Sequence, residues 1–307
     1  MIKLIKSKQN RQDLNDTSYI ELKDIKKQFG KHLILKDLNL KIDKDEILGI
    51  IGSSGSGKST ILKLLIGFYR PTEGKIYFQG KNIYKDMNEV KKTFGFATED
   101  NSFYKSLTVK ENLCYFGSLY NIPSKLIKKR VNELMKLVGL EEAENTLGEN
   151  LSIGMQRRLD IICALIHNPK VLILDEPTED LDPILRKQLI GVIQKIRRNG
   201  TTVILTSHLL HEVGDVCDKI AILHNKRIIE VKSPDDLKSE YQTNSLDMVF
   251  RAVIERKEYL KKEKKKDIKK LLKEKIKPIN RKPLLPFKIR IERAGVKKED
   301  ETRKSNK

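Results

Sequence analysis

The residues most suited to chemistry lie in one stretch, ILGIIGSSGSGKST, which runs from residue 47 to residue 60. An apolar run with strand character stops at Gly52, and a helical pattern begins after Lys58 and Ser59. The spacing G-x-x-x-x-G-K-S suits a loop that surrounds phosphate oxygens with backbone N–H groups, because glycines have no Cβ atom to prevent a close approach. The lysine is expected to reach the β- and γ-phosphates, and the serine hydroxyl is a suitable ligand for Mg²⁺. The stretch therefore predicts a site for a nucleoside triphosphate with Mg²⁺. The residues expected to contact the nucleotide are Gly52, Ser53, Ser54, Gly55, Ser56, Gly57, Lys58, Ser59 and Thr60.

Two further groups of polar residues follow short apolar runs of strand character. Asp175 and Glu176 come directly after VLIL, and His208 follows the run 202–206. A carboxylate at the end of a buried strand can bind Mg²⁺ from the side opposite Ser59, so Asp175 is the expected metal ligand. Glu176 is then the expected base that orients a water molecule, and His208 the expected hydrogen-bond partner of the γ-phosphate. The alternative is a solvated acidic turn and a surface histidine, but a buried strand that ends in the acidic pair favours a catalytic site.

Strands and helices alternate along most of the chain. Helices of ten residues or more between apolar strands predict an α/β fold with a mainly parallel sheet covered on both faces. The expected strands are 19–25, 33–42, 47–51, 75–78, 94–98, 171–174, 202–206, 219–223 and 227–231. The expected helices are 61–66, 108–140 with an interruption at Pro123, 151–167 with Ser152 as its N-cap, 183–199, and one from Leu209.

Composition restricts where the protein works. The chain has 307 residues and a formal net charge of +20. Residues 251–307 hold 23 Lys and Arg against 9 Asp and Glu, a net of +14, so the preceding residues carry +6. We find neither the apolar run of about 18 to 20 residues that a membrane helix needs nor a secretion signal, and we expect a cytosolic protein. The three cysteines have neither disulfide nor zinc spacing and are expected to serve packing; they are Cys114, Cys163 and Cys217.

The motifs occur together in an order that resembles the ATP-binding subunit of ATP-binding cassette (ABC) transporters, from about residue 19 to about residue 237. GSSGSGKST from Gly52 resembles the Walker A motif, and VLILDEP from Val171 resembles the Walker B motif with its catalytic glutamate. LSIGMQRR from Leu151 is similar to the family signature. TEDLDP from Thr178 resembles the D-loop, and TSH resembles the segment that ends in the switch histidine, here His208.

This resemblance implies a P-loop NTPase fold with a mainly parallel core sheet, an antiparallel β subdomain and a helical insertion subdomain. It also implies a head-to-tail dimer, expected to be a homodimer, in which Ser152 and Gly154 of one subunit close over the ATP of the other. Asp182 in the D-loop joins the expected nucleotide-binding residues. Phe29 alone is either a core residue or a ring that stacks on adenine. The family pattern favours stacking.

The same reading divides the chain into three parts. Residues 1–18 are expected to form a flexible arm, and residues 19–240 the ATPase domain with its helical insertion at about 100–165. Residues 241–307 form a basic extension, expected to be partly helical or disordered. The extension has three interpretations: it lies on an anionic membrane surface, it binds RNA without sequence preference, or it is only a solvated tail.

Two positions depart from the family pattern. Glu99 stands where the family usually has glutamine, in a loop that is expected to sense and bind Mg²⁺ and to take part in catalysis. A third carboxylate near Asp175 and Glu176 is expected to raise a pKa. We therefore predict slower or more Mg²⁺-dependent hydrolysis than in Glu99→Gln, to be measured as ATPase rates across a Mg²⁺ titration. Equal rates would instead indicate that Glu99 keeps the oxygen ligand and changes little. The second departure is Ile153 with Met155 in the signature, a variant that resembles those of exporters.

The expected function is ATP hydrolysis by a dimer on the cytoplasmic face of the cell membrane. Hydrolysis would drive export through a separate permease, which is expected to dock at the helical insertion and the Glu99 loop. The alternative is a soluble ABC-type ATPase that acts on nucleic acid or ribosomes. The single Walker A motif and the short spacing from Ser59 to Asp175 disfavour it, so nucleic acid is not an expected partner. A module that only binds nucleotide is disfavoured by Glu176 and His208.

Overall fold

The computed structural model describes residues 18–256 and residue 259. A six-stranded sheet lies at its centre, with strand order β10-β9-β3-β8-β7-β6. Strands β9, β3, β8, β7 and β6 run parallel, and only β10 is antiparallel to its neighbour. The bounds are β3 (Ile47–Ile51), β6 (Phe94–Ala97), β7 (Val171–Leu174), β8 (Thr202–Ser207), β9 (Lys219–His224) and β10 (Arg227–Lys232). The expected mainly parallel sheet is confirmed.

Strands β3 and β7 have no polar side chain because both faces of the sheet are covered. Every residue of β3 and β7 is buried. Leu48, Ile50 and Ile173 point into one core, whereas Ile47 and Leu174 point into another. Such continuous burial is what a parallel sheet between two layers requires.

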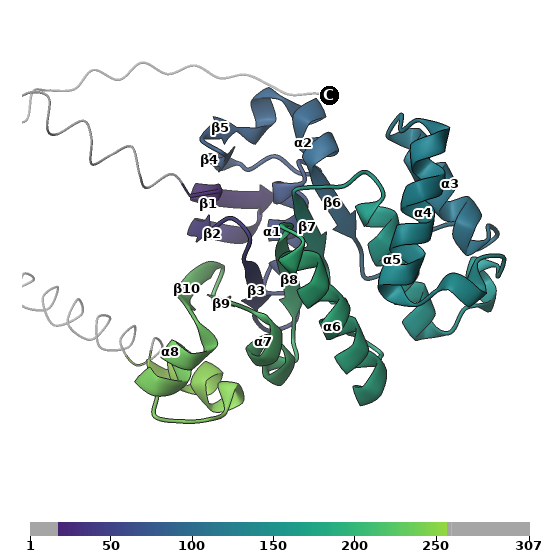
Figure 1. Ribbon diagram of the computed structural model, residues 1–307. Coiled ribbons are helices and arrows are strands. Elements are labelled where there is room, and N and C mark those ends of the chain that lie inside the picture. The colour runs from purple at the N-terminus through teal and green to yellow at the C-terminus, as the bar shows by residue number, and fades with distance from the viewer. Residues whose placement is uncertain (1–17, 257–258, 260–307) are drawn as a thin grey trace, which may run out of the picture. The chain divides into compact units, whose positions relative to one another are not determined.

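A second, antiparallel sheet has the strand order β2-β1-β4-β5. Its strands are β1 (Ile20–Phe29), β2 (His32–Ile42), β4 (Glu73–Phe78) and β5 (Lys81–Asn82). Their buried residues share a core with α1 (Lys58–Leu65) and with one face of the central sheet. The expected antiparallel β subdomain is therefore present, and it holds α1 against β3 (Figure 1).

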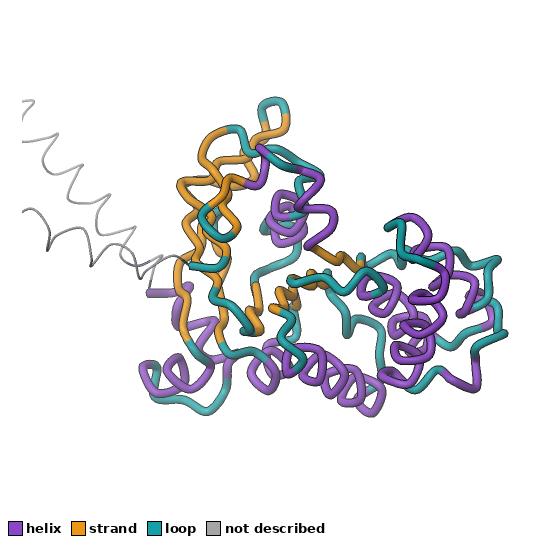
Figure 2. Tube along the Cα trace, turned by 45° about the horizontal axis from the view of Figure 1, so that its top comes forward, coloured by secondary structure: helices purple, strands orange, loops and turns teal. Residues whose placement is uncertain are grey.

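The remaining helices include a lobe inserted between β6 and β7, formed by α3, α4 and α5. Figure 2 shows these helices gathered at one side of the central strands, and α5 packs against β6. The bounds are α2 (Met87–Thr93), α3 (Val109–Leu119), α4 (Ser124–Val138), α5 (Ile153–Leu165), α6 (Pro183–Arg198), α7 (Leu210–Val216) and α8 (Pro234–Glu240). The predicted helix 108–140 divides at Pro123 into α3 and α4, as expected. Ser152 is the N-cap of α5, since its hydroxyl accepts a hydrogen bond from the Met155 N–H.

The structure differs from the expected boundaries near the C-terminus. Residues 246–256 are helical, and Leu246, Val249 and Val253 are buried in the core under the central sheet. The compact unit thus continues through Arg256, past the expected domain end at residue 240. The predicted arm, apart from residue 18, and most of the basic extension lie outside the described residues.

Two other features bear on the sequence predictions. Among the described helices, none is both long and apolar enough to span a bilayer. The three cysteines are free thiols, and Cys163 and Cys217 are buried in the core.

Candidate active site

The loop after β3 begins at Gly52 and ends at the first turn of α1. Gly55 and Gly57 have φ values of +71° and +110°, which are strained for residues with a Cβ atom. At Gly52 the φ is ordinary, but a Cβ atom would come within 2.6 Å of the Leu223 carbonyl oxygen. Gly57 is the N-cap of α1 and offers no side-chain acceptor, which leaves the first N–H groups of the helix available to an anion.

The loop fits a phosphate group in a second respect. Ser56 Oγ is buried, and it has no hydrogen-bond partner within the described part of the chain. A buried hydroxyl of this kind needs a ligand or a solvent molecule. The residues Ser54 to Thr60 also line an open cavity of about 620 Å³, together with Ile34, Glu99, Glu176, Glu179 and His208.

Asp175 and Ser59 meet at the edge of this cavity. Ser59 Oγ donates to Asp175 Oδ1 at 3.2 Å, and Thr206 Oγ1 donates to the same oxygen at 2.6 Å. Strand pairing explains these contacts, because β8 has β7 as its parallel neighbour on one side and β3, which leads to Ser59, on the other. The arrangement offers one hydroxyl and one carboxylate oxygen to a hard cation such as Mg²⁺. In the described residues no three His, Cys, Asp or Glu side chains are grouped to hold a metal by themselves. A cation here would need further oxygen ligands, from phosphate groups or water.

Glu176 lies between Lys58 and His208. Lys58 Nζ is 3.2 Å from Glu176 Oε1 and donates to the Gly52 carbonyl oxygen at 3.0 Å. Both side chains are buried; Lys58 is only 8% exposed. Glu176 Oε2 accepts from His208 Nδ1 at 3.0 Å and from the His208 backbone N–H at 3.1 Å. Glu176 itself has a φ of +47°, a strained value for a residue with a side chain.

Glu99 reaches the same cavity from the loop after β6. Its pKa is raised above the ordinary value, first by desolvation and then by Glu179, Asp175, Asp100 and Glu176. The direction agrees with the expectation drawn from three carboxylates around one site. The structure therefore brings the predicted residues Lys58, Ser59, Glu99, Asp175, Glu176 and His208 to one place.

Other predicted site residues lie apart from this cavity. Ser152 is exposed at the start of α5, and Gly154 packs against Leu185 of α6. Asp182 is the N-cap of α6 and accepts hydrogen bonds from the Ile184 and Leu185 N–H groups at 2.8 and 3.0 Å. None of the three lines the cavity. They stay predictions for an interface with a second copy.

Phe29 is at the end of β1 and is 38% exposed, so it is not a core residue. Its ring makes an edge contact with Tyr69 at 4.9 Å between centroids, and Lys27 Nζ lies 4.5 Å from its centroid. Phe29 does not line the cavity. Its stacking on adenine stays a prediction.

Sequence reasoning missed Thr206 and Glu179. Thr206 Oγ1 donates to Asp175 and accepts from the Glu176 N–H at 3.0 Å, so it fixes both acidic residues. Its position at the end of β8 could have indicated this role. Leu205 pairs with Leu174, so the next residues, Thr206 and Asp175, are neighbours at the strand ends. Glu179 had no signal beyond its closeness to Glu176 in the sequence.

The family model described as ABC transporter matches residues 35–179. The linearmycin resistance ATP-binding protein LnrL of Bacillus subtilis (strain 168) is 35% identical over 218 residues, 71% of this chain and 70% of that protein. The chain belongs to the ABC transporter family. The methionine import ATP-binding protein MetN 1 of Bacillus thuringiensis subsp. konkukian (strain 97-27) is 35% identical over 225 residues, 72% of this chain and 66% of that protein.

Solved structures agree with this membership. One described as the ATP binding subunit of an ABC transporter is 27% identical, with a TM-score of 0.70 over 77% of this chain and all of that chain. The ABC protein described here is thus an ATP-binding subunit and an ATPase, with the expected P-loop fold.

Proposed function

We propose that this ABC subunit hydrolyses ATP as one of two identical copies and thereby drives export through a separate membrane permease. The observation that carries the hydrolytic part is the placement of Glu176, with Lys58 Nζ at 3.2 Å and His208 Nδ1 at 3.0 Å. A carboxylate beside the lysine of a phosphate loop is positioned to take a proton from a water molecule that attacks the γ-phosphate.

The other residues supply charge and orientation. Lys58 and the N–H groups of the glycine loop would bind the phosphate oxygens, and His208 would donate to the γ-phosphate. Ser59, Asp175 and Glu99 are the proposed protein ligands of Mg²⁺, which when bound would offset the charge of the phosphates. Thr206 keeps Asp175 in place through its hydroxyl.

The need for a second copy follows from the residues that lie outside the cavity. The cavity is open, and Ser152 at the start of α5 is exposed to solvent. Ile153 and Ile184 beside these predicted interface residues are also exposed, at 57% and 72%. Large apolar side chains in such positions favour burial against another protein surface. We therefore assign this surface to the second copy.

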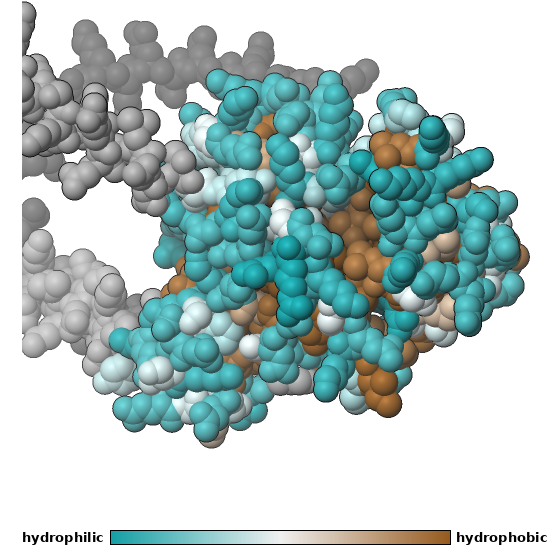
Figure 3. All heavy atoms as spheres, in the orientation of Figure 1, coloured by the Kyte–Doolittle hydropathy of each residue, from teal (hydrophilic) through white to brown (hydrophobic). Residues whose placement is uncertain are grey.

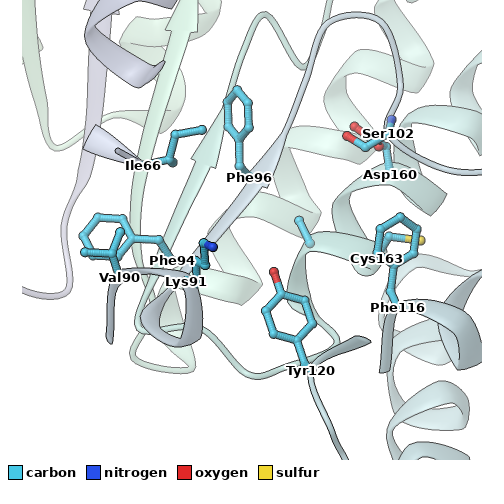
Figure 4. A pocket seen from close by; sticks show the side chains of 11 residues that line it. Ile66, Val90, Lys91, Phe94, Phe96, Ser102, Phe116, Tyr120, Asp160 and Cys163 are labelled. Atoms are coloured by element: carbon cyan, nitrogen blue, oxygen red, sulfur yellow. The ribbon is translucent and has the colours of Figure 1, made fainter. Parts of the chain in front are cut away.

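The permease is proposed to dock in a groove between the edge strand β6 and the helical lobe. The groove has a volume of about 210 Å³, and Figure 4 shows Phe94, Phe96, Phe116 and Tyr120 around it. Apolar residues are also visible between the central sheet and the lobe in Figure 3. An aromatic groove beside the Glu99 loop suits a short amphipathic helix from the cytoplasmic side of a permease.

Export is favoured by the signature variant with Ile153 and Met155, and one relative is named for resistance to linearmycin. Another relative is named for methionine import, so the direction of transport rests on the signature. The basic segment 251–307 would favour the anionic cytoplasmic face of the membrane, with RNA as its alternative ligand.

Replacement of the proposed base tests the hydrolytic mechanism. Glu176→Gln keeps the size of the side chain but cannot accept the proton, so we expect kcat for ATP hydrolysis to fall by at least ~100-fold. ATP binding should persist, and size-exclusion chromatography with ATP and Mg²⁺ should show a dimer. Glu142→Gln, an exposed change in the helical lobe, is the control. A Glu176→Gln protein that hydrolyses ATP normally, or that stays monomeric with ATP, would contradict the proposal.

Co-purification tests the partner. A membrane protein recovered with the native chain supports the permease, because an export subunit needs a separate partner that spans the membrane. Ribosomes or DNA recovered in its place would support the soluble ATPase.

A further inference from the structure

The end of the helical lobe where α3 turns into α4 carries apolar side chains that face solvent. Leu119 is 59% exposed, Tyr120 36% and Leu126 39%. The turn is held by its own backbone, since the Leu126 N–H donates to the Pro123 carbonyl oxygen at 2.8 Å. We call residues 119–129 the lobe tip. Its leucines are therefore fixed at the surface and are not part of the core.

The apolar side chains of the lobe tip lie close to one another. Arg130 is one helical turn after Leu126, so the two side chains share a side of α4. Arg130 Nη1 donates at 2.8 Å to the carbonyl oxygen of the residue before His167. His167 in turn stacks on Tyr120, with ring centroids 3.8 Å apart. Leu126 and Tyr120 are therefore directed toward the same neighbour, and Leu119 directly precedes Tyr120 at the end of α3.

Lysines accompany these apolar side chains. Residues 119–132 contain four basic residues and no Asp or Glu. Lys125, Lys128 and Lys129 are exposed, and their spacing of three and four residues places them on one face of α4. Lys129 Nζ lies 3.8 Å from Glu133 Oε1, so its charge is partly offset. The lobe tip therefore presents positive charge beside an apolar patch.

This combination fits the surface of a membrane that contains anionic lipids. Lysine ammonium groups can approach the lipid phosphates, while leucine side chains and a tyrosine ring enter the boundary between headgroups and acyl chains. RNA would also attract the lysines, but contact with its phosphates and bases gains little from Leu119 and Leu126. A single exposed leucine is ordinary in a protein, whereas two leucines and a tyrosine beside three lysines favour a lipid surface.

The position of the lobe tip agrees with this partner. Tyr120 also lines the groove of about 210 Å³ beside β6, where we place the permease. A permease that spans the bilayer would bring the bilayer to this side of the subunit, so the lobe tip would lie near the lipid headgroups. This orientation rests on the proposed function, but the binding itself requires neither ATP nor a permease.

We propose that the lobe tip binds the headgroup region of an anionic membrane. Lys125 and Lys128 are directed to the lipid phosphates, and Leu119 and Leu126 enter the headgroup region. This contact is distinct from the one proposed for the basic segment 251–307. Its test therefore changes residues of the lobe tip alone and leaves that segment intact.

The first test measures binding of the full-length chain to vesicles by co-sedimentation. Phosphatidylcholine vesicles with about 30% phosphatidylglycerol provide the anionic surface, and pure phosphatidylcholine is the reference. Each lysine near such a surface adds about fivefold to the affinity. With Lys129 counted as offset by Glu133, the triple variant Lys125→Gln, Lys128→Gln, Lys129→Gln should bind roughly 25-fold more weakly.

A second triple variant controls for net charge. Lys44→Gln, Lys187→Gln, Lys195→Gln removes three exposed lysines outside the lobe tip, so both variants fall from a net charge of +20 by 3. The control should bind within about twofold of the unmodified chain, because salt screens charges that lie more than a Debye length from the lipid surface. Equal weakening of the two triple variants overturns the inference.

A tryptophan reporter tests the apolar part of the contact. The chain contains no tryptophan, so Leu119→Trp introduces a single one. Its emission should shift to shorter wavelength with anionic vesicles, because the ring leaves water. Ile184→Trp, at an exposed apolar position on α6, should show no shift. Vesicle binding without a shift in the Leu119→Trp protein overturns the inference.

Binding to polyuridine RNA separates the two anionic partners. A lobe-tip triple variant that loses binding to this RNA but keeps its binding to vesicles would assign the lysines to nucleic acid and overturn the inference. None of these measurements uses ATP. Their failure would therefore leave the proposed hydrolysis untouched, and a chain without ATPase activity would contradict only the proposed function.

Discussion

Thr178 shows how a single hydroxyl can order the residues around Glu176. Its Oγ1 donates to Glu212 Oε2 at 2.6 Å, and both side chains are buried. Glu212 Oε1 is paired with Arg186 Nε at 2.5 Å, and Arg186 Nη2 donates to the Leu181 carbonyl oxygen at 2.9 Å. This network spans the segment between Glu176 and the N-cap of α6, so it fixes the path of the chain after the proposed base.

Replacing Thr178 by valine tests the effect of the hydroxyl, because valine has nearly the same shape but cannot donate a hydrogen bond. Valine leaves Glu212 without the donor, so we expect a loss of about 1.5 to 3 kcal/mol in unfolding free energy. Because Glu176 is two residues away, kcat should also fall by roughly 10- to 100-fold. Thr178→Ser keeps the hydroxyl and is the matched control. Urea unfolding and steady-state ATPase assays measure the two effects. Equal unfolding free energies and equal kcat values for the two variants would show that the Thr178 hydroxyl does not matter.

At the scale of elements, the packing of β6 on α5 depends on Gly95. A Cβ atom at this position would lie 2.3 Å from the Ala164 carbonyl oxygen, a backbone atom that cannot rotate away. Gly95→Ala should therefore destabilise the protein by about 1 to 3 kcal/mol. Gly191→Ala in α6 is the matched control, since no atom lies within 4 Å of its added Cβ. That change should stabilise the fold by about 0.5 to 1 kcal/mol. Thermal unfolding of both variants checks the pair.

Most elements could be predicted because their apolar patterns are long or fully buried. Strands β3 and β7 match their expected bounds, since an apolar run between polar turns marks a buried parallel strand. Helices α2 and α8 were not predicted, because each has only seven residues and few apolar ones. Helix α1 begins at Lys58 and not at the expected Ile61, because the left-handed Gly57 lets the loop enter the helix earlier.

The site could be predicted only as far as strand ends and motifs allowed. Glu176 comes shortly after β7 and His208 directly after β8, and their contact follows from the parallel pairing of the two strands. Thr206 and Glu179 were not predicted as site residues, because the direction in which each side chain points is not fixed by the sequence pattern.

At the scale of the whole molecule, His167 makes stability depend on pH. It stacks on Tyr120 from the end of α3, with centroids 3.8 Å apart, and its Nε2–H donates to the Phe94 carbonyl oxygen at 3.1 Å. Burial lowers its pKa to about 4, and Arg130 adds to this effect. The unfolded chain, with an ordinary pKa of 6.5, takes up the proton first as the pH falls. Stability is therefore lost between pH 6.5 and pH 4.

We expect this group to remove about 2 kcal/mol of unfolding free energy between pH 7 and pH 5. His167→Gln keeps a donor for the Phe94 carbonyl oxygen and does not titrate, so the decline over this interval should be smaller by that amount. Urea unfolding at the two pH values measures the difference. The same decline in both proteins would show that His167 titrates normally in the fold.

The contacts of Glu176 link its access to water with the binding of ATP. One carboxylate oxygen faces Lys58 and the other accepts two hydrogen bonds from His208, so both oxygens are already engaged. In that arrangement Lys58 competes with a water molecule for the approach to Oε1. Lys58 is also the residue expected to bind the phosphates, so ATP would draw it away from Glu176. Binding of ATP would then itself make the base more accessible to water.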